Sequence, residues 1–384
     1  MMTKINCIGL VITFLMVNSC TIKDDIPAEL TNNNLSSDID IAVDNIYNGY
    51  KDNLNTIGLS IGILKNGETH FYGYGETKKG SGNIPNQNTF YEIGSISKTF
   101  TSILAVNMLL QQDLDIETSI KSYLPEDLPT LNRNGIEVNF KHLLTHTSGL
   151  GRMPNNFNKS KDAGKEFADY DERLLYSYIE NARLHADPFT QFLYSNVGMG
   201  IVGTVLKRNY EMDYGKVLQQ ELTIPLGLSN TTAYFEDTNI DNWATGYNYK
   251  GKETDYWETL NALDGAGVIN STISDLLIYA QANITPPETQ LGNAIRITHE
   301  VYFKEYETGD YGKSQNCLGW FKFTPTSLPD KSFIQHNGLT GGFNSELLIN
   351  LENETAITVL FNKAPLNNEG RQAFISELLQ LLSE

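Results

Sequence analysis

Strand-like segments lie at both ends of this chain, and helix-like segments fill the middle. The segment 56–76 contains two alternating apolar runs joined at Lys65-Asn66-Gly67, and Asn-Gly between such runs indicates a β-hairpin. Further strand-like runs lie at 333–339 and 342–362, the second with a turn at 350–353. We therefore expect an α/β (α+β) fold in which the two ends of the chain build one antiparallel sheet.

The segments between and beside these strands have apolar residues at helical spacing. They cover 38–54, 97–112, 140–146, 196–209, 271–284 and 371–384. The chain has no internal repeat, and 40% of its 384 residues are hydrophobic, which is enough for a large core. We expect one large domain or two closely joined lobes.

The net charge of the chain is strongly negative. At pH 7 it is −18, and no run of Lys and Arg reverses this locally. Such a surface repels the phosphates of nucleic acids and anionic lipid headgroups, so nucleic-acid binding is excluded as an expected function.

The N-terminus has the organisation of a bacterial export signal. Lys4 precedes the apolar run 8–17, which is shorter than the roughly twenty residues of a spanning helix. VNSC at 17–20 resembles a lipobox, in which the cysteine is lipidated. We expect a signal peptide at 1–19, a lipidated Cys20 with a polar tether to 37, and a catalytic domain at 38–384.

An outer-membrane location follows from this interpretation. The residues after Cys20, TIKDD, resemble the acidic signal that directs some lipoproteins to the cell surface, so the protein faces either the periplasm or the exterior. Its membrane contact would be the lipid anchor alone, and we expect a monomer. With Cys7 removed in the signal peptide and Cys20 lipidated, Cys317 would be the only free thiol of the mature protein. We expect it to be an ordinary buried residue.

The stretch YEIGSISKTF at 91–100 carries the clearest candidate chemistry. Ser95 follows a glycine and precedes a helical run, and Lys98 lies about 60° around and about 4.5 Å along such a helix, on the same face. A serine hydroxyl needs a neighbouring base, and a lysine with a pKa lowered by burial can serve. Ser97 would point elsewhere.

Two other patterns are interpreted as structural. Gly58-Leu59-Ser60-Ile61-Gly62 matches the G-x-S-x-G nucleophile elbow, which needs a strand, a sharp turn and a helix. Here it lies inside the first strand of the hairpin, so Ser60 should be a strand residue. His142 and His146 have the spacing of zinc ligands, but HLLTH lacks the glutamate of H-E-x-x-H, and we expect no metal.

Several motifs in one order resemble the penicillin-recognising serine hydrolases, the group of class C β-lactamases, DD-peptidases and family VIII esterases. The resemblance covers about residues 40–384. Its motifs are S-x-x-K at 95–98, HLLTHTSGL at 142–150, Y-x-N at 194–196 and His336-Asn337-Gly338 in place of K-T-G. It implies a β-lactamase/transpeptidase-like fold, an antiparallel sheet flanked by helices, with the site between the sheet and a helical lobe.

The resemblance also implies roles for the motif residues. Ser95 would be the nucleophile that forms an acyl-enzyme, and Lys98 and Tyr194 would share the general-base work, with the charge of Lys98 lowering the pKa of the phenol. The N–H groups of Ser95 and Leu339 would form the oxyanion hole. No cofactor is implied.

Substrate contacts are implied for three further residues. Asn196 would bind the side-chain amide of the substrate, and His336 and Gly338 would line the substrate site. His336 is a departure, because β-lactamases of this class usually have lysine there and some DD-peptidases have histidine. We expect His336 to recognise a substrate carboxylate more strongly as it gains charge at falling pH.

The sequence indicates a small-molecule substrate but does not identify which one. A β-lactam is the leading expectation, and a D-Ala-D-Ala peptide or an ester is the alternative. A catalytically silent sensor protein is a further alternative, against which the intact Ser95, Lys98 and Tyr194 argue. The rate of deacylation, which separates these enzymes, is not readable from the sequence.

Replacing the lipidated cysteine should release the protein from the membrane. In Cys20→Ser the lipid cannot be attached, and no second apolar segment lies in the tether, so we expect the protein in the soluble fraction. Fractionation followed by immunoblotting tests this. A Cys20→Ser protein that stays with the membrane would show that another element anchors it.

Overall fold

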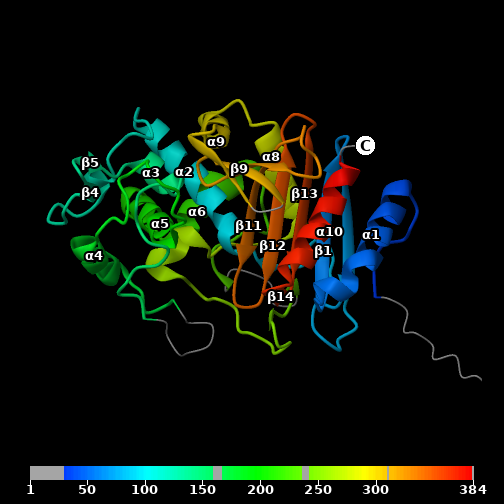
Figure 1. Ribbon diagram of the computed structural model, residues 1–384. Helices are drawn as coiled ribbons and strands as arrows, with labels where there is room; N and C mark the ends of the chain where they lie inside the picture. The colour runs from blue at the N-terminus through cyan, green and yellow to red at the C-terminus, as the bar shows by residue number, and fades with distance from the viewer. Residues whose placement is uncertain (1–29, 159–166, 236–241, 309–310, 383–384) are drawn as a thin grey trace, which may run out of the picture.

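A computed structural model shows an eight-stranded antiparallel sheet beside a helical lobe (Figure 1). The structure describes residues 30–158, 167–235, 242–308 and 311–382. In spatial order the strands are β2 (Glu68–Gly75), β1 (Gly58–Lys65), β13 (Thr355–Phe361), β12 (Asn344–Asn350), β11 (Phe333–Leu339), β10 (Phe321–Pro325), β9 (Gly312–Asn316) and β8 (Phe303–Glu307).

The two ends of the chain meet inside this sheet, as the sequence predicts. β1 pairs with β13, with Leu59 opposite Phe361 and Leu64 opposite Ala356. The hairpin turn lies at Asn66-Gly67, where both residues have positive φ. The sheet therefore joins the N-terminal hairpin to the C-terminal hairpin β12–β13.

Three strands, β8 to β10, were not predicted. They extend the sheet beyond β11 and are short, and many of their side chains are exposed or half-buried. Charged and polar residues such as Lys304, Lys313 and Lys322 interrupt the apolar alternation. Short, partly exposed strands near the edge of a sheet carry little sequence signal, because few of their side chains are buried.

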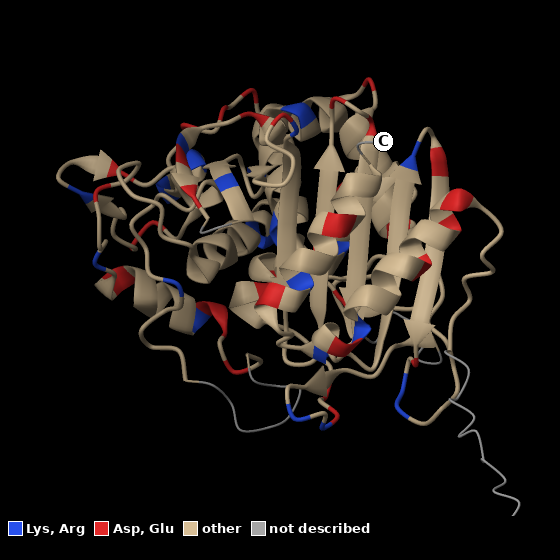
Figure 2. Ribbon diagram, turned by 45° about the vertical axis from the view of Figure 1, so that its right-hand side comes forward, with Lys and Arg blue, Asp and Glu red and all other residues tan. Residues whose placement is uncertain are grey.

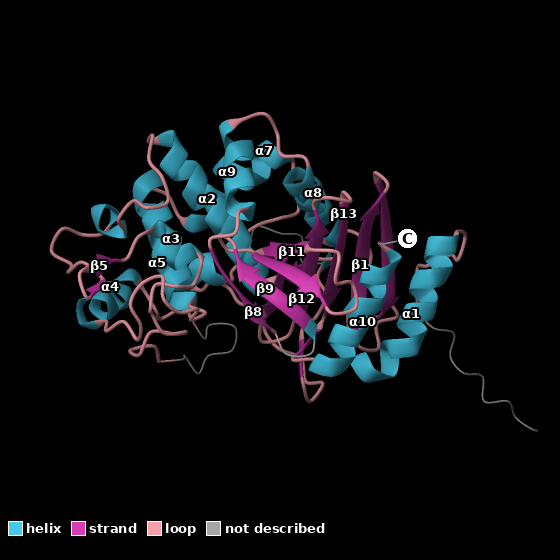
Figure 3. Cartoon of the chain, turned by 45° about the horizontal axis from the view of Figure 1, so that its top comes forward, coloured by secondary structure: helices cyan, strands magenta, loops and turns pink. Residues whose placement is uncertain are grey.

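Helices cover both faces of the sheet (Figure 3). α1 (Asp38–Leu54) and α10 (Asn368–Leu381) lie on one face, and α8 (Ile273–Ile284) packs against β1, β12 and β13 from the other. β1 is buried on both faces: Ile61 and Ile63 belong to the core under α1 and α10, whereas Leu64 belongs to the core of the helical lobe. Figure 2 shows that charged residues lie mainly on helices and loops.

The helical lobe is built around α2 (Ser97–Gln111), whose residues Ser97–Leu109 are all buried. Its other helices are α3 (Phe140–Leu144), α4 (Glu172–Asn181), α5 (Asn196–Tyr210), α6 (Tyr214–Leu218), α7 (Ile224–Leu226) and α9 (Gln290–His299). The sequence predicts α2, α3, α5 and α8 but not α4, α6, α7 or α9.

Short elements complete the lobe and join it to the sheet. The 3-10 turns are η1 (Gly94–Ile96), η2 (Ile120–Tyr123) and η6 (Asn261–Ala266), and η3 (Gln219–Thr223) is a π-helical turn. The two-residue strands pair as β3 (Tyr91–Glu92) with β7 (Asn270–Ser271), β4 (Asn132–Arg133) with β5 (Ile136–Glu137), and β6 (Tyr247–Asn248) with β14 (Lys363–Ala364).

The predicted signal peptide and Cys20 lie outside the described residues. Of the predicted tether, the described part begins at Leu30 and lies beside β2, where Thr31 forms a β-bridge with Tyr74. Ser37 then caps α1. In the described ranges, no helix combines the length and apolarity that crossing a bilayer requires.

A close contact between β11 and the turn η1 joins sheet and lobe. A Cβ on Gly338 would lie 2.0 Å from the carbonyl oxygen of Ile93 and 2.3 Å from Ser345 Oγ. Real side chains do not reach such distances, so β11 and η1 can approach this closely only because residue 338 is glycine.

Gly338→Ala should therefore destabilise the protein. The methyl group meets backbone that cannot rotate away, and overpacking of this kind costs about 1–3 kcal/mol. Thermal or urea unfolding measures the loss. Gly341→Ala is the matched control, because a Cβ there would lie 3.6 Å from Trp257 Nε1, its nearest neighbour. Equal stability of the two variants would contradict the proposed contact.

Candidate active site

Ser95 lies where the turn η1 enters α2, at the junction of sheet and lobe. Gly94 has a φ of +51°, and a Cβ there would lie 2.9 Å from the backbone nitrogen of Leu339. Glycine at 94 thus allows the turn that brings the backbone of Ser95 beside the end of β11. The prediction that Ser95 begins a helical segment is confirmed, with a 3-10 turn preceding the helix.

Lys98 contacts Ser95 directly. Its Nζ lies 2.9 Å from Ser95 Oγ and 2.5 Å from the carbonyl oxygen of Ala266. The side chain is fully buried, and burial, with the nearby charge of Arg152, lowers the pKa of Lys98 well below its usual value. Burial therefore favours the uncharged amine, whose lone pair can accept a proton. Ser97 points away and accepts a hydrogen bond from Ile269 N.

Tyr194 completes this group from the segment before α5. It hydrogen-bonds Ser95, and its ring centroid lies 5.0 Å from Lys98 Nζ. The next residue, Ser195, caps α5: its Oγ accepts from Gly198 N and donates to Gly151 O. The cap fixes the start of α5 and with it the position of Tyr194.

The expected direction of the tyrosine pKa was wrong. Burial raises the pKa of Tyr194 to about 12, although the hydrogen bond with Ser95 and the charge of Arg152 act in the opposite direction. The expectation relied on the charge of Lys98 to lower the pKa of the phenol, but burial lowers the pKa of the lysine as well, which disfavours that charge. Tyr194 is thus a protonated phenol that can donate.

The expected charge on His336 was also wrong. His336 is 2% exposed in β11, and burial, with Lys98 nearby, lowers its pKa to about 3. Its Nδ1 lies 2.7 Å from Asn337 O, and because a carbonyl only accepts, Nδ1 carries the hydrogen. The neutral ring keeps a lone pair on Nε2, which has no partner. His336 does not gain a charge between pH 6 and 8.

The two residues predicted to form the oxyanion hole, Ser95 and Leu339, lie close together. Ser95 N belongs to the first turn of η1, where N–H groups have no partner within the helix. Leu339 N lies beside Gly94 at the end of β11. Ser95, Gly338, Leu339 and Gly94 all line the same cavity, and the oxyanion-hole role of the two N–H groups stays a prediction.

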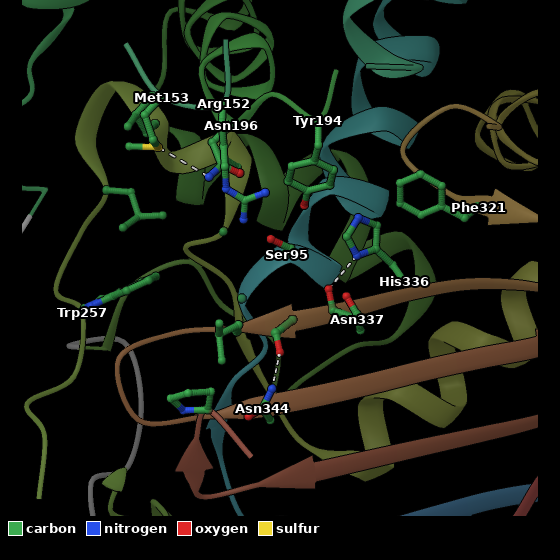
Figure 4. Close-up of a pocket in the computed structure, with 18 of the residues that line it drawn as sticks. Ser95, Arg152, Met153, Tyr194, Asn196, Trp257, Phe321, His336, Asn337 and Asn344 are labelled. Carbon is green, nitrogen blue, oxygen red and sulfur yellow. Dashed lines mark hydrogen bonds between the residues drawn. The ribbon is translucent and has the colours of Figure 1, made fainter. Parts of the chain in front are cut away.

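Asn196, the first residue of α5, lines the cavity on the side across from β11 (Figure 4). Its Nδ2 donates to Met153 Sδ at 3.5 Å, and its Oδ1 is buried without a hydrogen-bond partner. A buried carbonyl oxygen without a donor costs free energy until it is satisfied, so Oδ1 is ready to accept a hydrogen bond from a bound molecule.

The cavity around these residues has a volume of about 590 Å³, and Figure 4 shows its walls. Sheet and lobe both line it, as the sequence predicts. Aromatic and apolar side chains make up much of the wall, including Met153, Phe167, Trp257 and Phe321. A small organic molecule with a few polar groups fits such a pocket.

Sequence analysis missed Arg152. It lies two residues after HLLTHTSGL, and its guanidinium is 4.9 Å from the ring centroid of Tyr194. Its only signal in the sequence is its position just after the motif HLLTHTSGL, which we interpreted as structural. That interpretation holds for His142, which accepts from Asn139 N, and for His146, which accepts from Ser195 N.

Ser60 and Cys317 are structural residues, as the sequence predicts. Ser60 is buried within β1, 2.9 Å from Tyr91 Oη and on no sharp turn. Cys317 is 1% exposed, and burial raises its pKa to about 12, so it is an unreactive thiol. In the described part of the chain, no group of three or more His, Cys, Asp or Glu residues could hold a metal ion.

Comparison with known proteins places these residues in a family. The family model described as Beta-lactamase matches residues 43–382. The chain belongs to the Beta-lactamase family. A β-lactamase of Pseudomonas fluorescens is 27% identical over 366 residues, covering 87% of this chain and 96% of that protein. Penicillin-binding protein 4* of Bacillus subtilis is 25% identical, covering 82% of this chain and 69% of its own.

Solved structures of the Beta-lactamase family have the same fold. A class C β-lactamase matches with a TM-score of 0.74 and 25% identity, covering 90% of this chain and 96% of its own. A β-lactamase/D-alanine carboxypeptidase from Pseudomonas syringae matches with a TM-score of 0.75 and 24% identity, covering 90% and 99%. The expected β-lactamase/transpeptidase-like fold is confirmed.

Proposed function

We propose that this protein is a serine hydrolase that cleaves an amide bond, first of all that of a β-lactam, through an acyl-enzyme on Ser95. The observation that carries the proposal is the contact at 2.9 Å between Ser95 Oγ and Nζ of the fully buried Lys98, whose pKa is lowered by burial. A serine without such a base is inert at neutral pH.

Acylation begins with attack of Ser95 Oγ on the carbonyl carbon, while the hydroxyl proton passes to Lys98 Nζ. The N–H groups of Ser95 and Leu339 stabilise the oxyanion, and losing one such donor costs about 10² to 10³ in rate. The C–N bond then breaks. Tyr194 gives its proton to the leaving nitrogen and takes one from Lys98, because its raised pKa makes it a donor before it is a base.

Hydrolysis of the acyl-enzyme regenerates the serine. Water attacks the ester carbon and passes a proton to Lys98 and Tyr194. The bond between this carbon and Ser95 Oγ then breaks, and the oxygen takes that proton as the serine hydroxyl is restored. Asn196 Oδ1 would accept the N–H of the substrate's side-chain amide, and Gly338 and His336 would line the strand edge beside it. His336 acts there as a neutral group.

A second candidate substrate is a peptide ending in D-Ala-D-Ala. A neutral His336 at the position of the usual β-lactamase lysine favours it. The similar proteins include a penicillin-binding protein and a β-lactamase/D-alanine carboxypeptidase. The chemistry on Ser95 is the same in both cases. What differs is how fast water reaches the acyl-enzyme.

For the location of the protein, we propose an outer-membrane lipoprotein that acts as a monomer. The support is the sequence 1–20, with its short apolar run ending at Cys20, and the polar segment that follows. A catalytic domain on a lipid anchor would meet β-lactams or wall peptides in the cell envelope.

Acylation should be visible as added mass on Ser95. The purified domain is mixed with benzylpenicillin, quenched with acid after short and long times, and measured by intact mass and peptide mapping. We expect one penicilloyl group on Ser95, none in Ser95→Ala, and normal labelling in the control Ser60→Ala. Labelling that survives Ser95→Ala, or that depends on Ser60, would overturn the assignment.

Removing the hydroxyl of Tyr194 should stop turnover while the fold remains. We expect kcat of Tyr194→Phe to fall by about 10²-fold or more, because proton transfer to the leaving nitrogen is lost. Tyr210→Phe, which removes a hydroxyl bonded to Gln111 on the lobe surface, is the matched control. A Tyr194→Phe enzyme with the wild-type kcat would exclude the proposed role.

A further inference from the structure

Asp264 is a buried carboxylate in the turn η6, and it is 4% exposed. Its Oδ1 accepts hydrogen bonds from Leu260 N at 2.8 Å and from Thr259 Oγ1 at 3.1 Å, and its Oδ2 accepts one from Tyr234 Oη at 3.2 Å. A carboxylate removed from water is costly unless donors satisfy it, and three neutral donors do so here. The carboxylate therefore fixes the positions of the groups that donate to it.

The same aspartate ties both ends of the turn. Its side chain holds Thr259 and Leu260 before η6, and its backbone oxygen accepts from Gly267 N at 3.2 Å and from Val268 N at 3.3 Å after it. The segment 259–268 is thus closed around one residue. The course of its backbone depends on that residue's side chain.

Two helices hold η6 at close range. A Cβ on Gly203 of α5 would lie 2.8 Å from Gly265 N, and a Cβ on Gly265 would lie 2.5 Å from Met199 O. From α2, Thr101 Oγ1 donates to Gly265 O at 2.7 Å. Because backbone packs directly on backbone here, there is little room to absorb a change in the shape of the turn.

The last residue of the turn contacts the proposed base. Ala266 O lies 2.5 Å from Lys98 Nζ, and Ser95 Oγ lies 2.9 Å from the same nitrogen. In the neutral form that burial favours, the amine has two hydrogens and one lone pair. A carbonyl oxygen can only accept, so Ala266 O takes one of these hydrogens and restricts where the lone pair points. The position of η6 therefore helps to direct the lone pair to Ser95 Oγ.

We propose that Asp264 is a positioning residue for the reaction at Ser95. Its carboxylate keeps η6 in the shape that presents Ala266 O to Lys98, and so orients the amine that takes the serine proton. This inference rests on the proposed acylation of Ser95. Burial and the charge of Arg152 are the causes of the lowered pKa of Lys98, so Asp264 acts through the position of the turn and not through its own charge on the lysine.

The protonation of Asp264 gives this role a signature near neutral pH. Burial raises its pKa to about 6, although the hydrogen bonds from Leu260, Thr259 and Tyr234 and the charge of Lys207 act in the opposite direction. Above this pH the negative charge of the carboxylate strengthens the hydrogen bonds that it accepts. Below it the charge is lost and one oxygen becomes a hydroxyl donor, so the turn is held less firmly.

Other titratable groups surround Asp264. They come from α2, α4, α5, the start of α6 and the segment 231–235, and they are Lys98, Glu172, Lys207, Asp213, Tyr214 and Tyr234. Burial raises the pKa values of both tyrosines, and Lys207 pairs with Glu172 at 2.9 Å. Substitution of Asp264 itself therefore identifies its own contribution to the pH dependence.

The test follows acylation of Ser95 by benzylpenicillin from pH 5 to 8, measured as penicilloyl mass after quenching at short times. The wild-type rate constant should rise with pH through about 6 as Asp264 ionises. Asp264→Asn keeps the shape but cannot gain the charge, so this rise should be lost and the rate at pH 7 should fall about tenfold. The dissociation constant of benzylpenicillin, measured in a Ser95→Ala background, should not change, because the lysine acts in the chemical step.

Tyr234→Phe provides a second measurement. It removes the hydroxyl that donates to Asp264 Oδ2, and this hydrogen bond lowers the pKa of the carboxyl. The rise of the acylation rate should therefore move to higher pH in this variant. A residue that only supports the fold would not shift the pH dependence in this direction.

Asp275→Asn is the matched control. Asp275 is also a buried aspartate whose pKa burial raises, but it accepts from Asn230 N and Thr231 Oγ1 at the start of α8. We expect this variant to keep both the acylation rate and its pH dependence.

Stability separates positioning from a general loss of structure. Because burial raises the pKa of Asp264 above the value of about 4 for a solvated aspartate, its ionisation lowers the stability of the fold as pH rises from about 4 to 6. Asp264→Asn avoids this ionisation. It should therefore be at least as stable as the wild type in urea unfolding at pH 7.

Two results would overturn the inference. One is an Asp264→Asn protein with the wild-type acylation rate and pH dependence. The other is a loss of rate that accompanies weaker binding or lower stability, which would indicate a structural role. Either result leaves acylation of Ser95 standing, because the wild type still forms the adduct. A wild type without any adduct would instead overturn the proposed function, and the role of Asp264 with it.

Discussion

The burial of one lysine is the constraint on which the site depends. Lys98 lies in the first turn of α2, a helix buried on every side, and is out of contact with water. Burial disfavours its charged form, and the positive end of the helix dipole acts in the same direction. Its amine keeps a lone pair and still has polar neighbours in Ser95 Oγ and Ala266 O.

The same burial explains why the other titratable groups of the site are neutral. His336, His146 and Tyr194 surround the lysine, and for each of them loss of water is the largest cause of its pKa shift. Arg152 adds a charge from the edge of the pocket, where it faces the cavity. Loss of water thus favours the neutral forms of the groups at the centre, which suits them to pass protons from one to the next.

Contacts between segments distant in sequence bring these groups together. Ser95 belongs to the start of α2, Tyr194 precedes α5, and Leu339 ends β11. Close approach of η1 to β11 requires glycine at 94 and at 338. The capping serine before α5 ties the loop of Arg152 to the same place. The site therefore forms only when sheet and lobe are docked.

The sequence by itself determined the elements and the residue types of the site. Apolar alternation and Asn-Gly marked β1 and β2, helical spacing marked α2 and α5, and S-x-x-K with the later motifs identified Ser95, Lys98 and Tyr194, because these signals are local in the chain. The tertiary structure alone decided their protonation. His336 was expected to titrate near neutrality and Tyr194 to have a lowered pKa, and both expectations failed because a pKa depends on how much water the fold removes. Arg152 and the edge strands β8 to β10 emerged only in three dimensions, since their significance lies in what they face across space.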